Sequence, residues 1–254
     1  MRMNRMVVQV FSAALVAALW AGGGCAKKSE MVAPPDHVIA VKRASGPIVI
    51  DGVLDEAAWK KAARSGPFGF ADGKGGSPLF RTEAVLLWDD TNLYIGFDVE
   101  DPDVWNGYTK DDEPIYDEEV VEFFANPQDD QREYYEFQVN PQNVHFDAFF
   151  THHRSDLKKA VAWNGAWKSA VKVDGTRNKR DDIDKGYTVE ISIPFSLFHA
   201  AGGKAPKPGS HWRADMFRFE RPARRQIREA HAWSPTPNWD FHAMKDWGWI
   251  RFEK

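Results

Sequence analysis

Acidic side chains stand next to one another at several places in the sequence, and paired carboxylates are groups that could act as general acid and base. They include Asp89-Asp90, Asp111-Asp112, Asp117-Glu118-Glu119 and Asp181-Asp182. Cleavage of a glycosidic bond needs two carboxyl groups about 5–10 Å apart across the sugar, and spacing along the chain does not fix that distance. Acids in loops are also typical of solvated surfaces and of calcium sites. Both interpretations stay open at this point.

Metal and cofactor chemistry has limited support in the sequence. Asp101-Pro102-Asp103 is oxygen-rich and could take Ca²⁺, although its spacing is not that of an EF-hand. The adjacent His152 and His153 would point to opposite faces of a strand, which disfavours a two-histidine metal site. A b-type haem held by Met216 or Met244 with a histidine stays open, but Met216 lies in an apolar run typical of core. We expect no required cofactor, with Ca²⁺ as the candidate metal.

Aromatic residues are a second group that could bind a ligand, since they make up 13% of the chain and include 11 Trp. A sugar ring is held by aromatic rings against its C–H faces and by polar side chains at its hydroxyl edge. Three tryptophans fall inside helix or strand patterns and are expected in the core: Trp59, Trp88 and Trp212. Four rings lie in loops or at strand ends: Tyr116, Trp233, Trp239 and Phe241. These four either close the ends of the fold or contact a ligand.

Strand alternation places polar side chains together on one sheet face. In Glu133–Asn140 the residues Tyr134, Glu136, Gln138 and Asn140 share the face opposite Tyr135, Phe137 and Val139. In the preceding strand Glu122 points away from its apolar neighbours. The pattern indicates either a solvated outer face or a concave polar floor for a polar ligand.

The elements that would position these side chains are mostly strands. Short alternating runs are separated by Gly, Pro, Asn and Asp, and Asp89-Asp90-Thr91-Asn92 is a strong hairpin signal. The expected strands are Thr82–Trp88, Leu93–Val99, Glu119–Phe124, Glu133–Asn140, Val144–Thr151, Ala170–Val173, Tyr187–Ile193, Trp212–Phe219 and Trp249–Phe252. One short helix is expected over Asp55–Arg64. The sequence therefore predicts an all-β fold, a jelly-roll-like antiparallel β-sandwich with one short N-terminal helix.

Composition limits the class of partner. The 254 residues carry 33 Lys and Arg against 37 Asp and Glu, a net charge of −4, so no basic field exists for nucleic acid. The single Cys excludes an intrachain disulfide and a cysteine-cluster metal site.

The N-terminal segment has the pattern of an export signal. Arg2 and Arg5 precede an apolar run, and small residues stand directly before Cys25. We expect residues 1–24 to be a lipoprotein-type signal peptide, Cys25 to be lipidated, residues 25–37 to be a tether and residues 38–254 to be the sandwich. The membrane would then be a partner through the lipid anchor, and the chain would lie in the bacterial cell envelope as an outer-membrane lipoprotein, or be secreted.

An ordered series of motifs over about residues 38–253 resembles the family-nine carbohydrate-binding modules. The pieces, in chain order, are Ile48–Trp59 (IVIDGVLDEAAW), Trp88–Ile95 (WDDTNLYI), Asp101–Asp103 (DPD), Asp117–Phe124 (DEEVVEFF), Tyr187–Pro194 (YTVEISIP), Trp233–Pro235 (WSP) and Trp247–Gly248 (WG). Each piece is short, but together and in this order they are specific for the family.

The resemblance implies a β-sandwich that binds sugars, often at chain ends and often beside glycoside hydrolases. It implies two rings that clamp a terminal sugar, the first at Tyr116 and the second at Phe241 or Trp239. It implies polar contacts to hydroxyls from Glu122, Gln138 and Asn238, with Arg218 as a further donor. Family members have Trp at both ring positions and Arg where this chain has Gln138.

Three functions follow as expectations from the residues and the resemblance. The first is non-catalytic binding of a plant-type or bacterial polysaccharide in support of its breakdown. The second is a glycoside hydrolase or a hydrolase-associated module that acts on O-glycosyl bonds. The third is a sandwich domain that binds b-type haem.

Overall fold

A computed structural model of the chain describes residues 37–221 and 228–254. Thirteen strands are present in these residues: β1 (Val38–Arg43), β2 (Ala63–Pro67), β3 (Gly69–Phe70), β4 (Thr82–Trp88), β5 (Asn92–Glu100), β6 (Val120–Asn126), β7 (Tyr134–Val139), β8 (His145–Phe150), β9 (Lys168–Asp174), β10 (Gly186–Pro194), β11 (His211–Glu220), β12 (Glu229–Ala232) and β13 (Gly248–Phe252). The α-helix of the described residues is α1 (Leu157–Val161), and six 3₁₀ turns complete the set: η1 (Trp59–Lys61), η2 (Ile115–Asp117), η3 (Phe195–Leu197), η4 (His199–Ala201), η5 (Pro237–Trp239) and η6 (Met244–Asp246). No helix among the described residues is long and apolar enough to cross a membrane.

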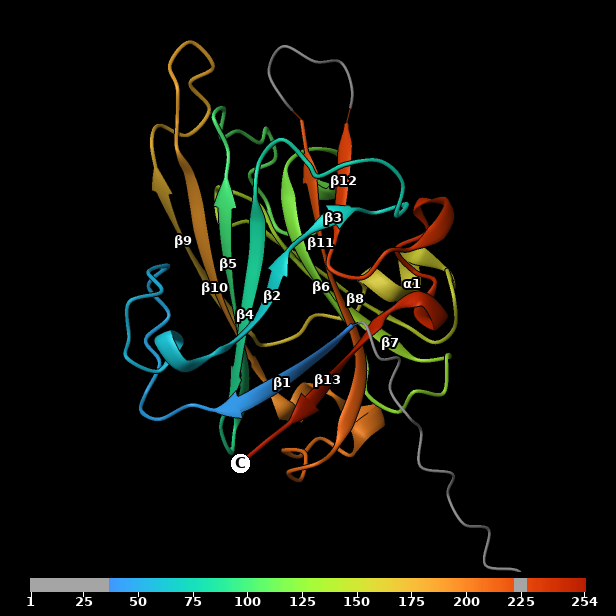
Figure 1. The fold of residues 1–254 in the computed structure, drawn as a ribbon. Coiled ribbons are helices and arrows are strands. Elements are labelled where there is room, and N and C mark those ends of the chain that lie inside the picture. Colours follow the sequence, from blue (N-terminus) through green and yellow to red (C-terminus); the bar gives the residue numbers. More distant parts are fainter. Residues whose placement is uncertain (1–36, 222–227) are drawn as a thin grey trace, which may run out of the picture. The chain divides into compact units, whose positions relative to one another are not determined.

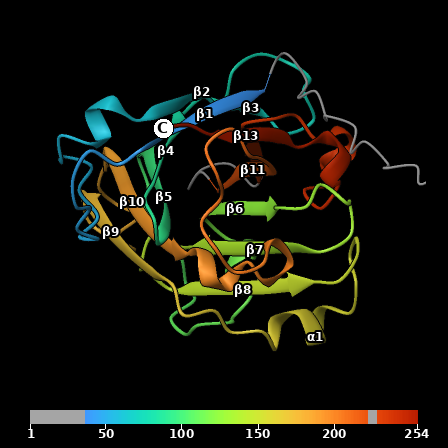
Figure 2. The ribbon, with the colours of Figure 1, turned by 90° about the horizontal axis from the view of Figure 1, so that it is seen from below.

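The strands form one curled sheet in the order β8-β7-β6-β11-β13-β1-β4-β5-β10-β9. Pairing is antiparallel except at β1, which runs parallel to both β13 and β4. In this order β1 joins the two halves of the sheet. The sheet folds over on itself, so that its halves face each other as the layers of a sandwich (Figures 1 and 2). The half that contains β8, β7, β6, β11 and β12 is called the front sheet below.

The core lies between the two halves, and strand alternation decides which side chains reach it. On β6 Val121 and Phe123 point into the core, and on β7 Tyr135 and Phe137 do the same. Their neighbours point to the outer face of the front sheet. A second apolar cluster covers that outer face; it includes Phe124, Tyr134, Phe146, Phe150, Phe217, Phe241 and Trp247. The front sheet is therefore buried on both faces, which excludes a solvated polar face.

The predicted β-sandwich is confirmed, and most predicted strands lie within two residues of the observed bounds. The predicted helix over Asp55–Arg64 is wrong in extent, since only the 3₁₀ turn η1 forms there. The reason is tertiary pairing: Ala63 bonds to Leu86 of β4 as the start of β2, and this extended backbone ends the helical turn. Trp59 is buried and its indole Nε1 donates to Glu190 Oε1 at 2.9 Å. Its expected place in the core is confirmed, as are those of Trp88 and Trp212.

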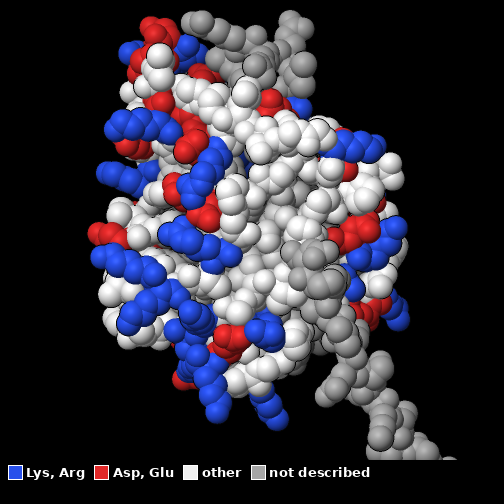
Figure 3. Space-filling view, in the orientation of Figure 1, with Lys and Arg blue, Asp and Glu red and all other residues white. Residues whose placement is uncertain are grey.

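The surface charges are mixed. In Figure 3 Lys and Arg gather along the side where Figure 1 shows β9 and β10, with Asp and Glu among them, and the middle of this face is largely uncharged. The predicted signal peptide (1–24), the lipidation site Cys25 and nearly all of the tether (25–37) lie outside the described residues.

Candidate functional site

A cavity of about 550 Å³ opens on the outer face of the front sheet. Its floor comes from β6, β7, β8 and β11, and its walls come from η2, from the start of α1 and from the loop that contains η5. Figure 1 shows α1 and the C-terminal loop segments on the same side of the molecule. The lining residues are Tyr116, Asp117, Glu122, Phe124, Glu136, Gln138, Phe146, Phe150, Arg154, Ser155, Asp156, Leu157, Phe219, Arg228, Trp239, Phe241 and His242.

Three polar side chains form the centre of the floor: Glu122, Glu136 and Gln138. The strand register makes them neighbours, because Glu122 pairs with Gln138 across β6 and β7 while Glu136 lies two residues away on β7. All three are buried, and the Gln138 amide nitrogen donates to Glu136 Oε1. Each of the three also has one oxygen without a hydrogen-bond partner among the described residues: Glu122 Oε1, Glu136 Oε2 and Gln138 Oε1. These three oxygens have almost no accessible surface, so the polar floor is buried with part of its hydrogen-bonding capacity unused.

Burial alters the protonation of these carboxyl groups. Removal from water raises the pKa of Glu136 to about 8, against smaller effects of the Gln138 hydrogen bond and of Arg154 that lower it. Burial and the nearby Glu136 hold the pKa of Glu122 well above its usual range, with Arg228 acting in the opposite direction. The two groups therefore titrate as a pair, and the protonated form is favoured near neutral pH in the free protein.

Phe241 lines the wall of the cavity, and its ring is already packed against other aromatic rings. Its ring stacks on Phe217 at 4.0 Å between centroids and 9° between planes, and on Phe219 at 4.8 Å. Only 5% of Phe241 is exposed. A ring with both neighbours in place has little free face for a ligand.

Trp239 differs from Phe241 because 46% of its surface is exposed. It lines the cavity at the rim, and Leu157 at the start of α1 is exposed on the same rim. Trp239 has a φ of 60° and the preceding Asn238 has a φ of 66°, so two consecutive residues adopt the left-handed conformation. Such backbone costs on the order of 1–3 kcal/mol for a non-glycine residue and is frequent at ligand sites. The fold therefore holds an open indole at the mouth of the cavity in an unfavourable conformation.

Tyr116 lies at the rim from the η2 side and is half-buried. Its ring meets Phe146 edge-on at 5.3 Å and 85°, and burial raises the pKa of its hydroxyl. Its backbone carbonyl accepts from the Arg228 guanidinium, which lies over the Phe219 ring with Cζ 3.2 Å from the centroid. Arg228 therefore supports both the Tyr116 wall and the floor.

A hydrogen-bonded chain fixes the remaining edge of the cavity. Asp240 accepts from Arg154 at 2.8 and 3.0 Å and from His153 Nε2 at 2.8 Å. His242 Nδ1 lies 2.7 Å from the Tyr134 hydroxyl, and burial together with the Arg154 charge lowers the pKa of His242 to about 4. His242 is therefore neutral at pH 7, so Arg154 and Arg228 are the cations that line the cavity.

The structure brings five of the seven candidate residues to this cavity: Tyr116, Glu122, Gln138, Trp239 and Phe241. Asn238 is exposed beside it and is not among its lining residues. Strand alternation placed Glu136 on the same face as Gln138, but Glu136 was not among the predicted site residues. Sequence reasoning also missed Arg228 and Arg154, which come from loops with no pattern to follow.

Arg218 does not line the cavity, because strand alternation turns it away. Its neighbours Phe217 and Phe219 lie on the outer face of the front sheet, so Arg218 points to the opposite face. There it is fully buried and bonds Asp101 Oδ2 at 3.1 Å, Glu220 Oε2, Thr82 Oγ1 at 3.2 Å and the Glu100 carbonyl at 3.0 Å. Arg218 thus belongs to a buried ionic cluster.

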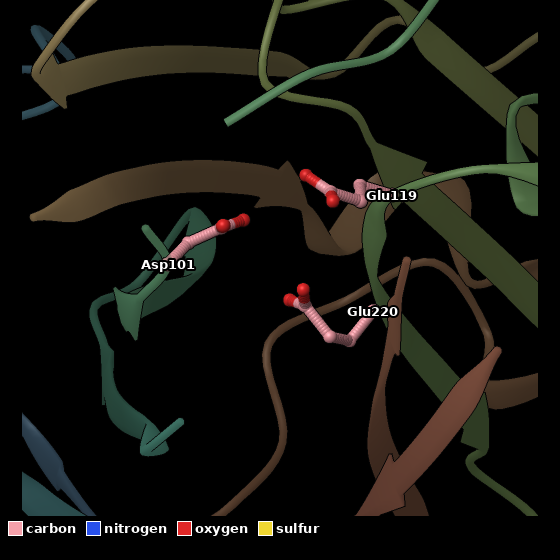
Figure 4. A group of neighbouring side chains, drawn as sticks. All are labelled: Asp101, Glu119 and Glu220. Carbon is pink, nitrogen blue, oxygen red and sulfur yellow. The ribbon is translucent and has the colours of Figure 1, made fainter. Parts of the chain in front are cut away.

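That cluster contains three carboxylates, Asp101, Glu119 and Glu220, whose oxygens lie within 4.8 Å of one another. Figure 4 shows the three side chains pointing toward one another from separate segments. Their donor set is of the kind that binds Ca²⁺. However, the Arg218 guanidinium already bonds two of them, and a metal ion held by the same oxygens would lie beside this positive charge. The Arg218 guanidinium therefore already serves as the cation of this cluster, and the cluster fits Arg218 better than it fits a calcium ion.

Burial also holds the pKa of Glu119 well above its usual range, with the nearby Asp101 acting in the same direction and Arg218 in the opposite one. This shift favours the neutral form of Glu119, which carries no negative charge toward Arg218. Asp103, two residues after Asp101, has a different partner, because its Oδ2 lies 2.6 Å from Arg180 Nη2. Met216, a candidate haem ligand, is fully buried in the core between the sheets.

Comparison with known proteins gives one family and several similar structures. The family model described as carbohydrate family 9 binding domain-like matches residues 50–254. A candidate carbohydrate-binding protein from Bacteroides uniformis has a TM-score of 0.66 and 15% identity, with 85% of this chain and 99% of that chain covered.

A carbohydrate-binding module of family 9 from Caldicellulosiruptor kristjanssonii, in complex with cellotriose, has a TM-score of 0.60 and 17% identity, with 85% of this chain and 93% of that chain covered. A structure of a family 9 module from the same organism in complex with glucose has a TM-score of 0.56 and 17% identity, with 84% and 95% covered. An extracellular protein of Arthroderma benhamiae is 27% identical over 146 residues, which are 56% of this chain. The match spans 64% of that protein's length.

Proposed function

Because the chain belongs to the carbohydrate family 9 binding domain-like family, we propose that it binds a carbohydrate without cleaving it, in the cavity on the front sheet. The observation that carries this proposal is the floor of Glu122, Glu136 and Gln138, with its three oxygens that have no partner among the described residues. A sugar offers several hydroxyl groups in a small volume, and such groups suit a floor of carboxyl and amide side chains.

The rim supplies the second half of a sugar site. Tyr116 and Trp239 both line the cavity, and Trp239 has an open face for the C–H groups of a pyranose. Phe241 is stacked on its own neighbours. We therefore assign the clamp to Tyr116 and Trp239, with Phe241 as the support beneath.

We propose a chain end as the ligand. The Caldicellulosiruptor kristjanssonii modules are in complex with cellotriose and with glucose. A cavity of about 550 Å³ has the size of a small-molecule site rather than of a groove for a long chain. We propose a role beside enzymes that break down plant-type or bacterial polysaccharides, on a chain exported and held to the envelope through Cys25.

Calorimetry tests the proposal with glucose, cellotriose and a panel of other oligosaccharides. The wild-type chain is expected to bind at least one, and Trp239→Ala should weaken binding about tenfold, since a stacked ring is worth about 0.5–1.5 kcal/mol beyond its buried area. The control is Ile183→Ala, which removes another exposed apolar side chain that does not line the cavity. Equal loss in both variants, or no binding to any sugar by the wild type, would refute the proposal.

A hydrolase is the second candidate, because two buried carboxyl groups with raised pKa values share the cavity. Release of reducing ends from cello-oligosaccharides and xylan separates the two accounts. If the chain only binds sugar, no reducing ends should be released. Release by the wild type that Glu122→Gln abolishes would make the chain a glycoside hydrolase.

A further inference from the structure

When Glu122 and Glu136 are ionised, the charges of the cavity are unbalanced at its floor. Two carboxyl groups, Glu122 and Glu136, lie fully buried there, and no ion pair joins either of them to a described residue. Further acids stand at the rim, Asp117 and Asp156. A positively charged occupant would therefore favour the ionised form of this floor.

The two cations that line the cavity are held by other partners. Arg154 donates to Asp240 through both Nε and Nη2. Arg228 donates to the Tyr116 carbonyl and lies flat on the Phe219 ring. Both arginines act on the floor through space, yet neither donates a hydrogen bond to Glu122 or Glu136 in the described residues. The floor thus lacks a bonded cation.

With both carboxyl groups ionised, the floor also lacks a spare donor. The donor of the Gln138 side chain is directed to Glu136 Oε1, which leaves the free oxygens of Glu122, Glu136 and Gln138 as acceptors. A neutral hydroxyl donates one hydrogen bond to such a site. A protonated amine donates three and brings the positive charge that the carboxylates lack.

From this arrangement we propose that the cavity selects a hexosamine with a free amino group, seated with its ammonium on Glu122, Glu136 and Gln138, over the neutral hexose and the N-acetylated sugar. This inference rests on the proposed function and names the class of sugar. N-acetylation removes the charge and leaves one donor, and a uronic acid would set a carboxylate against two others.

The protonation of the floor gives this selection a signature that packing alone would not produce. Since burial raises the pKa of both carboxyl groups, the empty floor holds protons near neutral pH that an ammonium ligand displaces. The titratable and charged groups that face this pair are Tyr116, Asp117, Arg154, Asp156, Arg228 and His242. A neutral sugar leaves the protons in place.

Calorimetry tests the inference with glucosamine, glucose and N-acetylglucosamine, and with the corresponding trisaccharides. Glucosamine should bind about tenfold more tightly than glucose, because a charge-assisted hydrogen bond is about twice as strong as a neutral one. Its heat should depend on the ionisation enthalpy of the buffer, and that of glucose should not. Glu136→Gln should abolish both the preference and the buffer dependence, so that glucosamine binds no more tightly than glucose, whereas Asp181→Asn, at an exposed acid that does not line the cavity, should keep both.

The outcomes separate this inference from the proposed function. Glucose binding equal to or tighter than glucosamine binding would overturn the inference and leave carbohydrate binding intact. Failure of every sugar to bind would overturn both. A preference for glucosamine that survives Glu136→Gln would also overturn the inference, because the selection would then not lie in this floor.

Discussion

The buried carboxyl group of Glu136 should make the stability of the whole chain depend on pH. Its pKa is about 8 in the folded protein against a usual 4.5, and burial is the main cause. A group whose pKa is raised on folding stabilises the native state below its unfolded pKa, and this contribution is lost as pH rises through the folded pKa. Stability should therefore fall between about pH 4.5 and pH 8 and level off above.

The magnitude follows from the two pKa values. A tenfold change in proton affinity is about 1.4 kcal/mol, so the rise from 4.5 to about 8 corresponds to at most about 5 kcal/mol. Glu122 shares the titration, so only a part of this free energy belongs to Glu136. The variant Glu136→Gln keeps the shape and removes this charge.

Urea unfolding at several pH values between about 5 and 8 measures the effect. The free energy of unfolding of the wild type should fall by a few kcal/mol over this range, and that of Glu136→Gln should fall less. Asp117→Asn, at the exposed rim of the same cavity, should follow the wild type. Parallel curves for the wild type and Glu136→Gln would refute the account of a protonated, desolvated floor.

Further variants separate structure from binding. Arg218→Met should reduce the free energy of unfolding by about 3–5 kcal/mol because it leaves Asp101 and Glu220 buried without their cation; a loss below 1 kcal/mol in urea would contradict this. Because Arg218 acts as the internal cation of that cluster, EDTA should leave Tm unchanged, and a fall in Tm that Ca²⁺ restores would show a metal there instead. Phe241→Ala should cost about 3–5 kcal/mol by removing a stacked ring, whereas Trp239→Ala should change stability little, and equal losses would contradict the separate roles given to the two rings.

Much of the fold could be predicted because alternation and turn residues act locally. The strand Thr82–Trp88 has the predicted bounds, and the Asp89–Asn92 turn follows it as expected. The face that holds Glu122 and Gln138 was also predictable, since period-two alternation along β6 and β7 fixes it. Whether that face was solvated or covered was not, because the covering segments come from distant parts of the chain.

The remaining errors have the same physical origin. Alternation should have turned Arg218 away from the face of Phe217 and Phe219, but only the pairing of β11 with β6 shows which face meets the cavity. The sequence predicts neither the packing of Phe241 nor the exposure of Trp239, because both depend on how the last loop returns to the sheet. The predicted helix over Asp55–Arg64 does not form because the end of this segment pairs with β4. Local helix propensity carries no information on such pairing.

A crystal structure of the chain soaked with cellotriose tests the central claim most directly. The account predicts a terminal sugar in the front-sheet cavity, with its ring between Tyr116 and Trp239 and its hydroxyls within hydrogen-bond distance of Glu122, Glu136 or Gln138. Sugar density at another surface, with this cavity holding only water, would contradict it.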